Sequence, residues 1–226
     1  MTVCVEWQFN AGAVTINVAE WPDNGPPLLF IHGVTSAWSS WERVVPGFVD
    51  SWHCYAIDLR GHGKSGHIPG GYHRDLYAVD PAELIRRAIG RPTYIVGHSL
   101  GATTAVGVTA LIPELVRAVV YEDPPLFSHE NRGTGASRFG WQLDLIESGV
   151  SVNEMAEVIH RHNGGERAAA DLKAHQLKML DPDVLRSTVS GKASENWDVA
   201  SQLRKARSPA LLLSANPEIG GVMTKD

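Results

Sequence analysis

Five residues near the middle of the chain, Gly97-His98-Ser99-Leu100-Gly101, have the types and spacing that acyl-transfer chemistry requires. They follow a short apolar run, Thr93 to Val96, which predicts a strand, and they open Leu100 to Leu111, which predicts a helix. A serine at such a corner projects its hydroxyl above the sheet. Flanking glycines are needed where side chains would collide with the neighbouring helix and strand. Ser99 is therefore the candidate nucleophile, since a serine that only caps the helix would leave both glycines unexplained.

A second segment, His32-Gly33-Val34, could supply part of an oxyanion hole. It comes directly after Leu28 to Ile31, a continuous apolar run that predicts a strand buried on both faces. An acyl-transfer site needs two backbone N–H donors, one from the residue after the nucleophile and one from the loop after an earlier strand. Leu100 and Val34 are the candidates. His32 could be mistaken for a catalytic base, but a loop histidine beside a glycine turn is expected to be structural.

The third segment is Asp58-Leu59-Arg60-Gly61-His62-Gly63-Lys64-Ser65. Its glycines and Lys64 suggest a phosphate-binding loop, but no glycine stands five residues before Gly63, as that motif requires. We interpret it as a tight loop held by Asp58 and Arg60, with a structural role.

Taken together and in this order, the three segments resemble those of the α/β-hydrolase superfamily, from about residue 3 to the end of the chain. The resemblance includes esterase, lipase-like and cofactor-free haloperoxidase-like members, and Ser99 disfavours members with an aspartate nucleophile. It implies a serine hydrolase that forms an acyl-enzyme on an ester or similar acyl substrate, with neither cofactor nor metal. His32, Gly33, Gly97, His98 and Gly101 would support the site.

Two residues could be the acid that follows the serine in the triad order of this fold. Glu218 lies in the turn after the apolar run Ala210 to Leu213, where the family usually carries the acid, and is preferred. Asp123 follows Val116 to Tyr121, where some members place it, although it could simply shape a turn.

The sequence departs from the family pattern in its histidines, because none lies after residue 213. Four histidines lie between residues 126 and 206, a polar stretch that is expected to be helical. Their side chains are expected to face solvent: His129, His160, His162 and His175. Without a base a serine is a poor nucleophile. Two readings remain open: a chain that lacks its last strand, histidine and helix, or a non-catalytic ligand-binding relative. The abrupt end at Asp226 favours the first, so this chain alone is expected to be inactive.

Alternation of strands and helices from residue 28 to 120 predicts an α/β fold with a mostly parallel sheet and helices on both faces. Before it, two alternating runs predict a hairpin. We expect a core from 1 to 125, a helical cap from 126 to 206 and the rest of the core from 207 to 226. The cap would choose a small apolar ester or acyl substrate.

Composition and charge argue against some classes of binding partner. The net charge of −5 gives no attraction to nucleic acid or to an anionic membrane. The N-terminus has neither the basic nor the apolar region of a signal peptide, and no apolar run is long enough to span a membrane, so a cytoplasmic protein is expected. The two cysteines form no metal-binding pattern. Nothing in the sequence indicates the oligomeric state.

Overall fold

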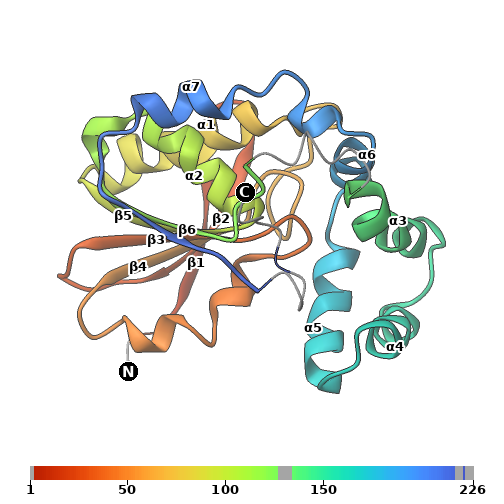
Figure 1. Ribbon diagram of the computed structural model, residues 1–226. Coiled ribbons are helices and arrows are strands. Elements are labelled where there is room, and N and C mark those ends of the chain that lie inside the picture. The colour runs from red at the N-terminus through yellow and green to blue at the C-terminus, as the bar shows by residue number, and fades with distance from the viewer. Residues whose placement is uncertain (1–2, 127–133, 217–220, 222–226) are drawn as a thin grey trace.

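The computed structural model describes residues 3–126, 134–216 and 221 (Figure 1). These residues form a seven-stranded sheet in the order β1-β2-β4-β3-β5-β6-β7. β1 and β2 pair antiparallel, β2 pairs antiparallel with β4, and the remaining neighbours are parallel. The strands are β1 (Val5–Asn10), β2 (Thr15–Trp21), β3 (Pro27–Ile31), β4 (His53–Ile57), β5 (Thr93–His98), β6 (Val116–Glu122) and β7 (Ala210–Leu213). The mostly parallel α/β sheet predicted from the sequence is confirmed.

Three helices cover one face of the sheet (Figure 1). α1 (Arg74–Leu84) and α7 (Val199–Lys205) both pack against α2 (Leu100–Leu111), which lies on β5 and β6. α1 continues through Pro81, where the sequence suggests a kink, and gives way to a π-helical turn over Ile85–Ile89. These helices cover the face of the sheet on which α2 packs, and α2 begins directly after Ser99.

On the opposite face, the sequence from Trp38 to Phe48 predicts a short helix. The structure has instead two 3-10 turns, Trp38–Trp41 and Val45–Gly47. Pro46 explains the interruption, because a proline disfavours helical geometry in the residue before it and donates no N–H. The turns pack Trp41 and Phe48 against Phe30 of β3, at ring-centroid distances of 5.1 and 5.6 Å.

Four helices form a separate group at one side of the sheet (Figure 1). They are α3 (Thr134–Glu147), α4 (Val152–Asn163), α5 (Arg167–Lys178) and α6 (Pro182–Val189). Their ends have clear local causes: Ser151 and Glu154 form a capping box at α4, and Pro182 begins α6 with Asp181 as its cap. The predicted cap, 126 to 206, also includes α7, but α7 packs against α2 of the core. We use "cap" below for α3 to α6.

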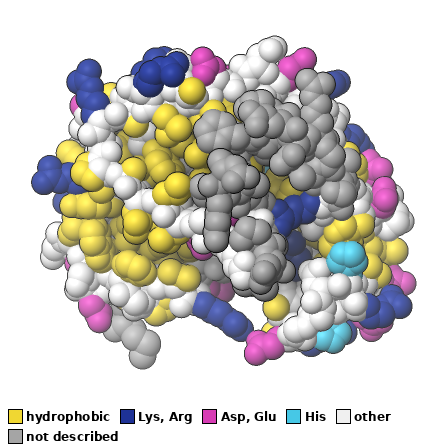
Figure 2. Space-filling model, viewed as in Figure 1, with side chains coloured by type: hydrophobic (Ala, Val, Ile, Leu, Met, Phe, Trp, Pro, Cys, Tyr) yellow, Lys and Arg dark blue, Asp and Glu magenta, His cyan; other side chains and the backbone are white. Residues whose placement is uncertain are grey.

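In the described residues β7 is the last strand of the sheet on its side, and it exposes apolar surface. Leu211 is 54% exposed, and Pro209, Ala210 and Leu211 line a groove of about 360 Å³ together with Trp52, Tyr94 and other residues of the same face. Figure 2 shows hydrophobic side chains gathered over this part of the sheet. Edge strands with exposed apolar residues favour association between chains.

We therefore expect Leu211→Thr to reduce both the binding of the dye ANS and the tendency to aggregate, with little change in stability because the side chain is already half exposed. Leu111→Thr is the matched control, since Leu111 is 46% exposed and does not line the groove. Dye fluorescence and light scattering measure the effect. Equal signals from the two variants would contradict it.

Candidate active site

Ser99 sits at a strained corner between β5 and α2. Its backbone has φ 52° and ψ −111°, a conformation that residues other than glycine rarely adopt. Such strain costs roughly 1–3 kcal/mol and is found mainly at functional sites. The Ser99 N–H donates to the carbonyl of Glu122 at 2.8 Å, and the Ser99 carbonyl accepts from Ala102 and Thr103. These bonds hold the corner from both sides.

The two glycines beside Ser99 are required by close backbone contacts. A Cβ on Gly97 would lie 2.4 Å from the carbonyl oxygen of Gly101, and a Cβ on Gly101 would lie 2.1 Å from that of Ile31. Both distances are far below van der Waals contact. The glycines therefore let α2 approach β5 and β3, as the sequence analysis expected for such a corner.

The segment Gly33-Val34 lies against this corner. A Cβ on Gly33 would stand 2.9 Å from Nδ1 of His98 and 3.5 Å from Cβ of Ser99. Leu100 is the first residue of α2, so its N–H has no acceptor within the helix. The structure thus brings Gly33, His98 and Ser99 together, with Val34 and Leu100 directly adjoining them in the chain.

His32 is held between two main-chain groups. Its Nδ1 lies 2.7 Å from the carbonyl of Gly33, and its Nε2 accepts the N–H of Leu59 at 3.0 Å. This pairing requires the neutral Nδ1–H tautomer. Burial lowers the pKa of His32 to about 4, with a smaller contribution from the charge of Lys173. The ring is therefore committed to the backbone on both sides and is not placed to take a proton from Ser99.

His62, in the loop after β4, has a supporting role that its position in the sequence did not indicate. Its Nε2 lies 2.7 Å from the carbonyl of Val34 and its Nδ1 lies 2.8 Å from that of Arg60. Burial lowers the pKa of His62 to about 3, so the ring is neutral and donates to one of these carbonyls at a time. The contact to Val34 spans 28 positions of sequence, so local spacing could not have revealed it.

The loop after β4 is held by buried charges, in keeping with the structural role expected for it. Asp58 is fully buried and accepts from the backbone N–H groups of Trp38 and Lys64 at 2.8 and 3.0 Å. Arg60 forms two 2.7 Å bonds to Asp80, also buried. Asp80 is a partner that no motif in the sequence indicated.

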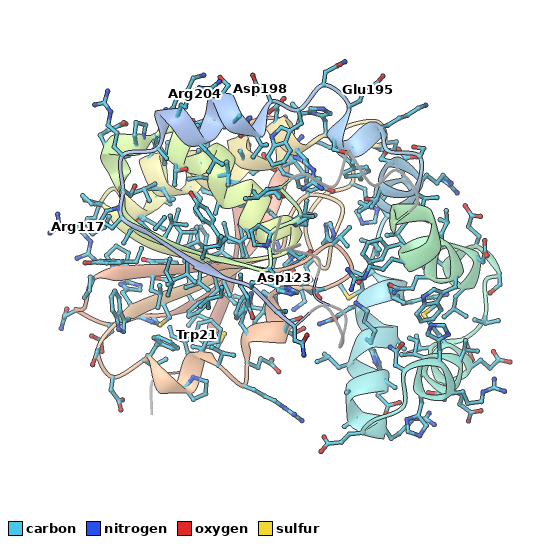
Figure 3. The ribbon with its side chains drawn as sticks, viewed as in Figure 1. Trp21, Arg117, Asp123, Glu195, Asp198 and Arg204 are labelled. Atoms are coloured by element: carbon cyan, nitrogen blue, oxygen red, sulfur yellow. The ribbon has the colours of Figure 1, made fainter. Side chains whose placement is uncertain are left out.

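Of the two candidate acids, only Asp123 lies within the described residues. Glu218 lies outside the described residues. Asp123 directly follows β6, is 7% exposed, and has a positive φ of 44°. Its N–H donates to the carbonyl of Leu213 at 2.7 Å, and its neighbour Glu122 holds the Ser99 N–H. Figure 3 shows Asp123 at the part of the sheet that faces the cap.

Two histidines of the cap contact groups other than Ser99. His162 stacks on Trp141 at 4.1 Å, and Nδ1 of His175 lies 2.8 Å from the carbonyl of Asp171. His160 has a buried Nδ1 without a hydrogen-bond partner, contrary to the solvent-facing position expected for it, and His129 lies outside the described residues. Among the described residues, no histidine is hydrogen-bonded to the Ser99 hydroxyl.

Three further observations concern the described part of the chain. In residues 3–126 and 134–216, no three His, Cys, Asp or Glu side chains converge as metal ligands. No helix of the described residues is long and apolar enough to cross a membrane. Neither the groove beside β7 nor a crevice of about 200 Å³ between α5 and the core is lined by Ser99.

Comparison with known proteins decides the family. The model of the alpha/beta hydrolase fold matches residues 26–209, which include Ser99, the Gly33 loop and all of the cap. The chain belongs to the α/β-hydrolase family. Its curated relatives in this family are hydrolases, including the Haemophilus influenzae protein named putative esterase/lipase, which is 32% identical over 57% of this chain.

Two α/β hydrolases illustrate the similarity. The 2-(acetamidomethylene)succinate hydrolase of Mesorhizobium japonicum is 42% identical over 116 residues, which are 51% of this chain and 41% of that protein. The N-formylmaleamate deformylase of Pseudomonas putida is 28% identical over 221 residues, which are 95% of this chain and 78% of that protein. The matches to the first curated relatives span less than half of their length.

Solved structures of the family agree with the fold. A crystal structure of E-2-(acetamidomethylene)succinate hydrolase has a TM-score of 0.71 at 25% identity and covers 93% of this chain and 80% of its own. A crystal structure of an N-formylmaleamic acid deformylase from Pseudomonas putida has a TM-score of 0.75 at 19% identity, with 95% and 86% covered. The second shows a likeness of fold alone.

Proposed function

We propose that this α/β hydrolase cleaves a carboxylic ester or similar acyl substrate through an acyl-enzyme on Ser99. The observation that carries the proposal is the strained backbone of Ser99 between two glycines that no other residue could replace without a clash. Strain of this kind persists only where the surrounding structure enforces it. The Gly33-Val34 segment lies against this half-buried serine, since a Cβ on Gly33 would stand 3.5 Å from Cβ of Ser99.

In the proposed reaction, Oγ of Ser99 attacks the substrate carbonyl carbon while its proton passes to a base. The N–H groups of Leu100 and Val34 stabilise the resulting oxyanion, since preorganised donors act strongly where charge develops. Collapse of the intermediate expels the leaving group and leaves the acyl group on Ser99. Water then attacks the ester and regenerates the hydroxyl. The base would be a histidine. None of the histidines in the described residues is hydrogen-bonded to the Ser99 hydroxyl, so the assays use the full-length protein.

The class of substrate is suggested by the relatives. One is named a deformylase and another a hydrolase of an acetamido compound, and both names describe acyl groups on nitrogen. We therefore propose amides beside esters as substrates, with the cap covering the site and selecting among them. A panel of short p-nitrophenyl esters and the matching anilides would separate the two.

The acyl-enzyme itself is tested by acid quenching during turnover of p-nitrophenyl acetate, followed by intact-mass measurement. The proposal expects one added acetyl group in the wild-type protein and none in Ser99→Ala. Turnover without any trapped acetyl group would contradict it. Binding of these compounds without turnover would instead favour the non-catalytic ligand-binding relative.

For the acid that orients the base, the geometry of the described residues supports Asp123. It is buried and adjoins Glu122, whose carbonyl holds the Ser99 N–H. We expect Asp123→Asn to lower kcat by about 10⁴-fold, the typical loss when a triad carboxylate becomes an amide, and to leave the fold intact. Glu218→Gln is the matched comparison and should stay within a few-fold of wild type. The opposite pattern of kcat values would assign the role to Glu218.

A further inference from the structure

Three consecutive carbonyls of the Gly33 loop are each approached by a basic side chain. The carbonyl of Gly33 lies against His32, and that of Val34 lies against His62. The third, that of Thr35, accepts from Nζ of Lys173 at 2.5 Å. His32 and His62 belong to the core, whereas Lys173 lies in the middle of α5 in the cap, 138 positions away in sequence.

Lys173 binds Thr35 twice, because its Nζ also donates to the hydroxyl of Thr35. Thr35 is 7% exposed, and Lys173 is half-buried at the junction of cap and core. Burial lowers the pKa of Lys173 to about 8. No acidic side chain of the described residues forms an ion pair with this ammonium. Its hydrogen bonds in the described residues go to Thr35. Withdrawing an ammonium from water without a carboxylate partner costs free energy, which the two bonds to Thr35 offset in part.

Other contacts between cap and core go to different places. The hydroxyl of Tyr72 donates to Asp181 at 2.5 Å, and the amide of Gln176 donates to the hydroxyls of Ser39 and Ser40. Gln176 lies one turn after Lys173 on α5, so both side chains reach the core from the same helix face. Lys173 differs in that it contacts the residue next to Val34.

We propose that Lys173 is a positioning residue that couples the cap to the oxyanion hole by fixing Thr35 and, through it, the backbone N–H of Val34. The inference rests on the proposed function for its catalytic consequence. The ammonium holds both polar groups of Thr35, and Ser36 N–H closes the same turn on the carbonyl of Gly33 at 3.1 Å. Through Lys173, the position of α5 thereby affects the loop that carries the oxyanion donor.

The catalytic consequence is tested with Lys173→Met, which keeps the apolar stem and removes the donors and charge. Against p-nitrophenyl acetate we expect kcat to fall about 10-fold to 100-fold with KM within a few-fold, because a small misplacement of a catalytic group costs about this much. Lys173→Arg should recover much of the loss. Gln176→Met is the control, since it removes a cap contact that does not touch the loop.

A purely structural role for Lys173 would show a different pattern. If Lys173→Met only loosened the cap, it would raise KM to the same extent as Gln176→Met and leave kcat unchanged. That result, or wild-type kinetics in Lys173→Met, would overturn the inference. Thermal melting of each variant shows whether the chain is folded.

Amide hydrogen exchange gives a second test that needs no activity. In Lys173→Met, the peptide spanning residues 33–37 should exchange faster than in wild type, and Gln176→Met should leave it unchanged. If wild type fails to hydrolyse any ester while the exchange result holds, the proposed function fails and the coupling of cap and loop stands. Unchanged exchange in Lys173→Met would overturn the coupling whatever the activity.

Discussion

Replacing Ser99 by alanine is expected to lower kcat on p-nitrophenyl esters by at least about 10⁴-fold and to leave KM nearly unchanged. Removing the nucleophile of a triad typically costs this much or more, while substrate binding and the oxyanion donors remain. The fold should survive, because the variant keeps Cβ and every backbone bond of the corner, including the N–H donated to Glu122 at 2.8 Å. Stopped assays and a thermal melt measure the two effects.

Ser190→Ala serves as the control for that experiment. Ser190 is exposed at the end of α6 and donates only a local hydrogen bond to the carbonyl of Ser187. Its loss should leave kcat and the melting temperature at wild-type values. Activity that survives in Ser99→Ala would show that another group is the nucleophile.

Gly101→Ala is expected to destabilise the protein and remove its activity together. The added Cβ would stand 2.1 Å from the carbonyl oxygen of Ile31 and 2.7 Å from that of His32, and both are backbone atoms that no side-chain rotation can move. We expect a loss of about 3 kcal/mol, at the upper end of overpacking effects. For a chain of this size that lowers the melting temperature by roughly 6–12 °C. Activity falls because the Gly33 loop must shift with His32.

The matched control is Gly140→Ala in α3. A Cβ there would meet nothing within 4 Å, and alanine is favoured over glycine within a helix by up to about 1 kcal/mol. The control should therefore melt at or slightly above the wild-type temperature. Two glycine variants with equal melting temperatures would contradict the close packing described for the corner of Ser99.

The core of the fold could be predicted because its signals are local. The bounds of α2 and β7 agree with the sequence prediction, since an apolar run and a stretch of small residues each mark an element directly. The predicted helix near Trp38 was wrong, because Pro46 divides the segment into two turns. Polarity alone does not reveal that α7, which lies within the predicted cap of 126 to 206, packs against α2.

The site was predictable only in part. Ser99 and Gly33 lie in short motifs, so the sequence could bring them to attention and the structure places them side by side. Contacts between distant segments could not be found in this way. Lys173 and Thr35 are 138 positions apart, and neither residue belongs to a motif. For Asp123, a positive φ directly before Pro124 is unexpected from sequence, because a residue before proline favours extended geometry.

We propose Ser99 as a nucleophile held beside two backbone donors. The most direct test is to treat the full-length protein with a fluorophosphonate, which phosphonylates activated serines, and to map the adduct by peptide mass spectrometry. We expect one adduct per chain, on Ser99, and no adduct in Ser99→Ala. An adduct on a different residue, or a protein that hydrolyses esters yet resists the reagent, would contradict the account.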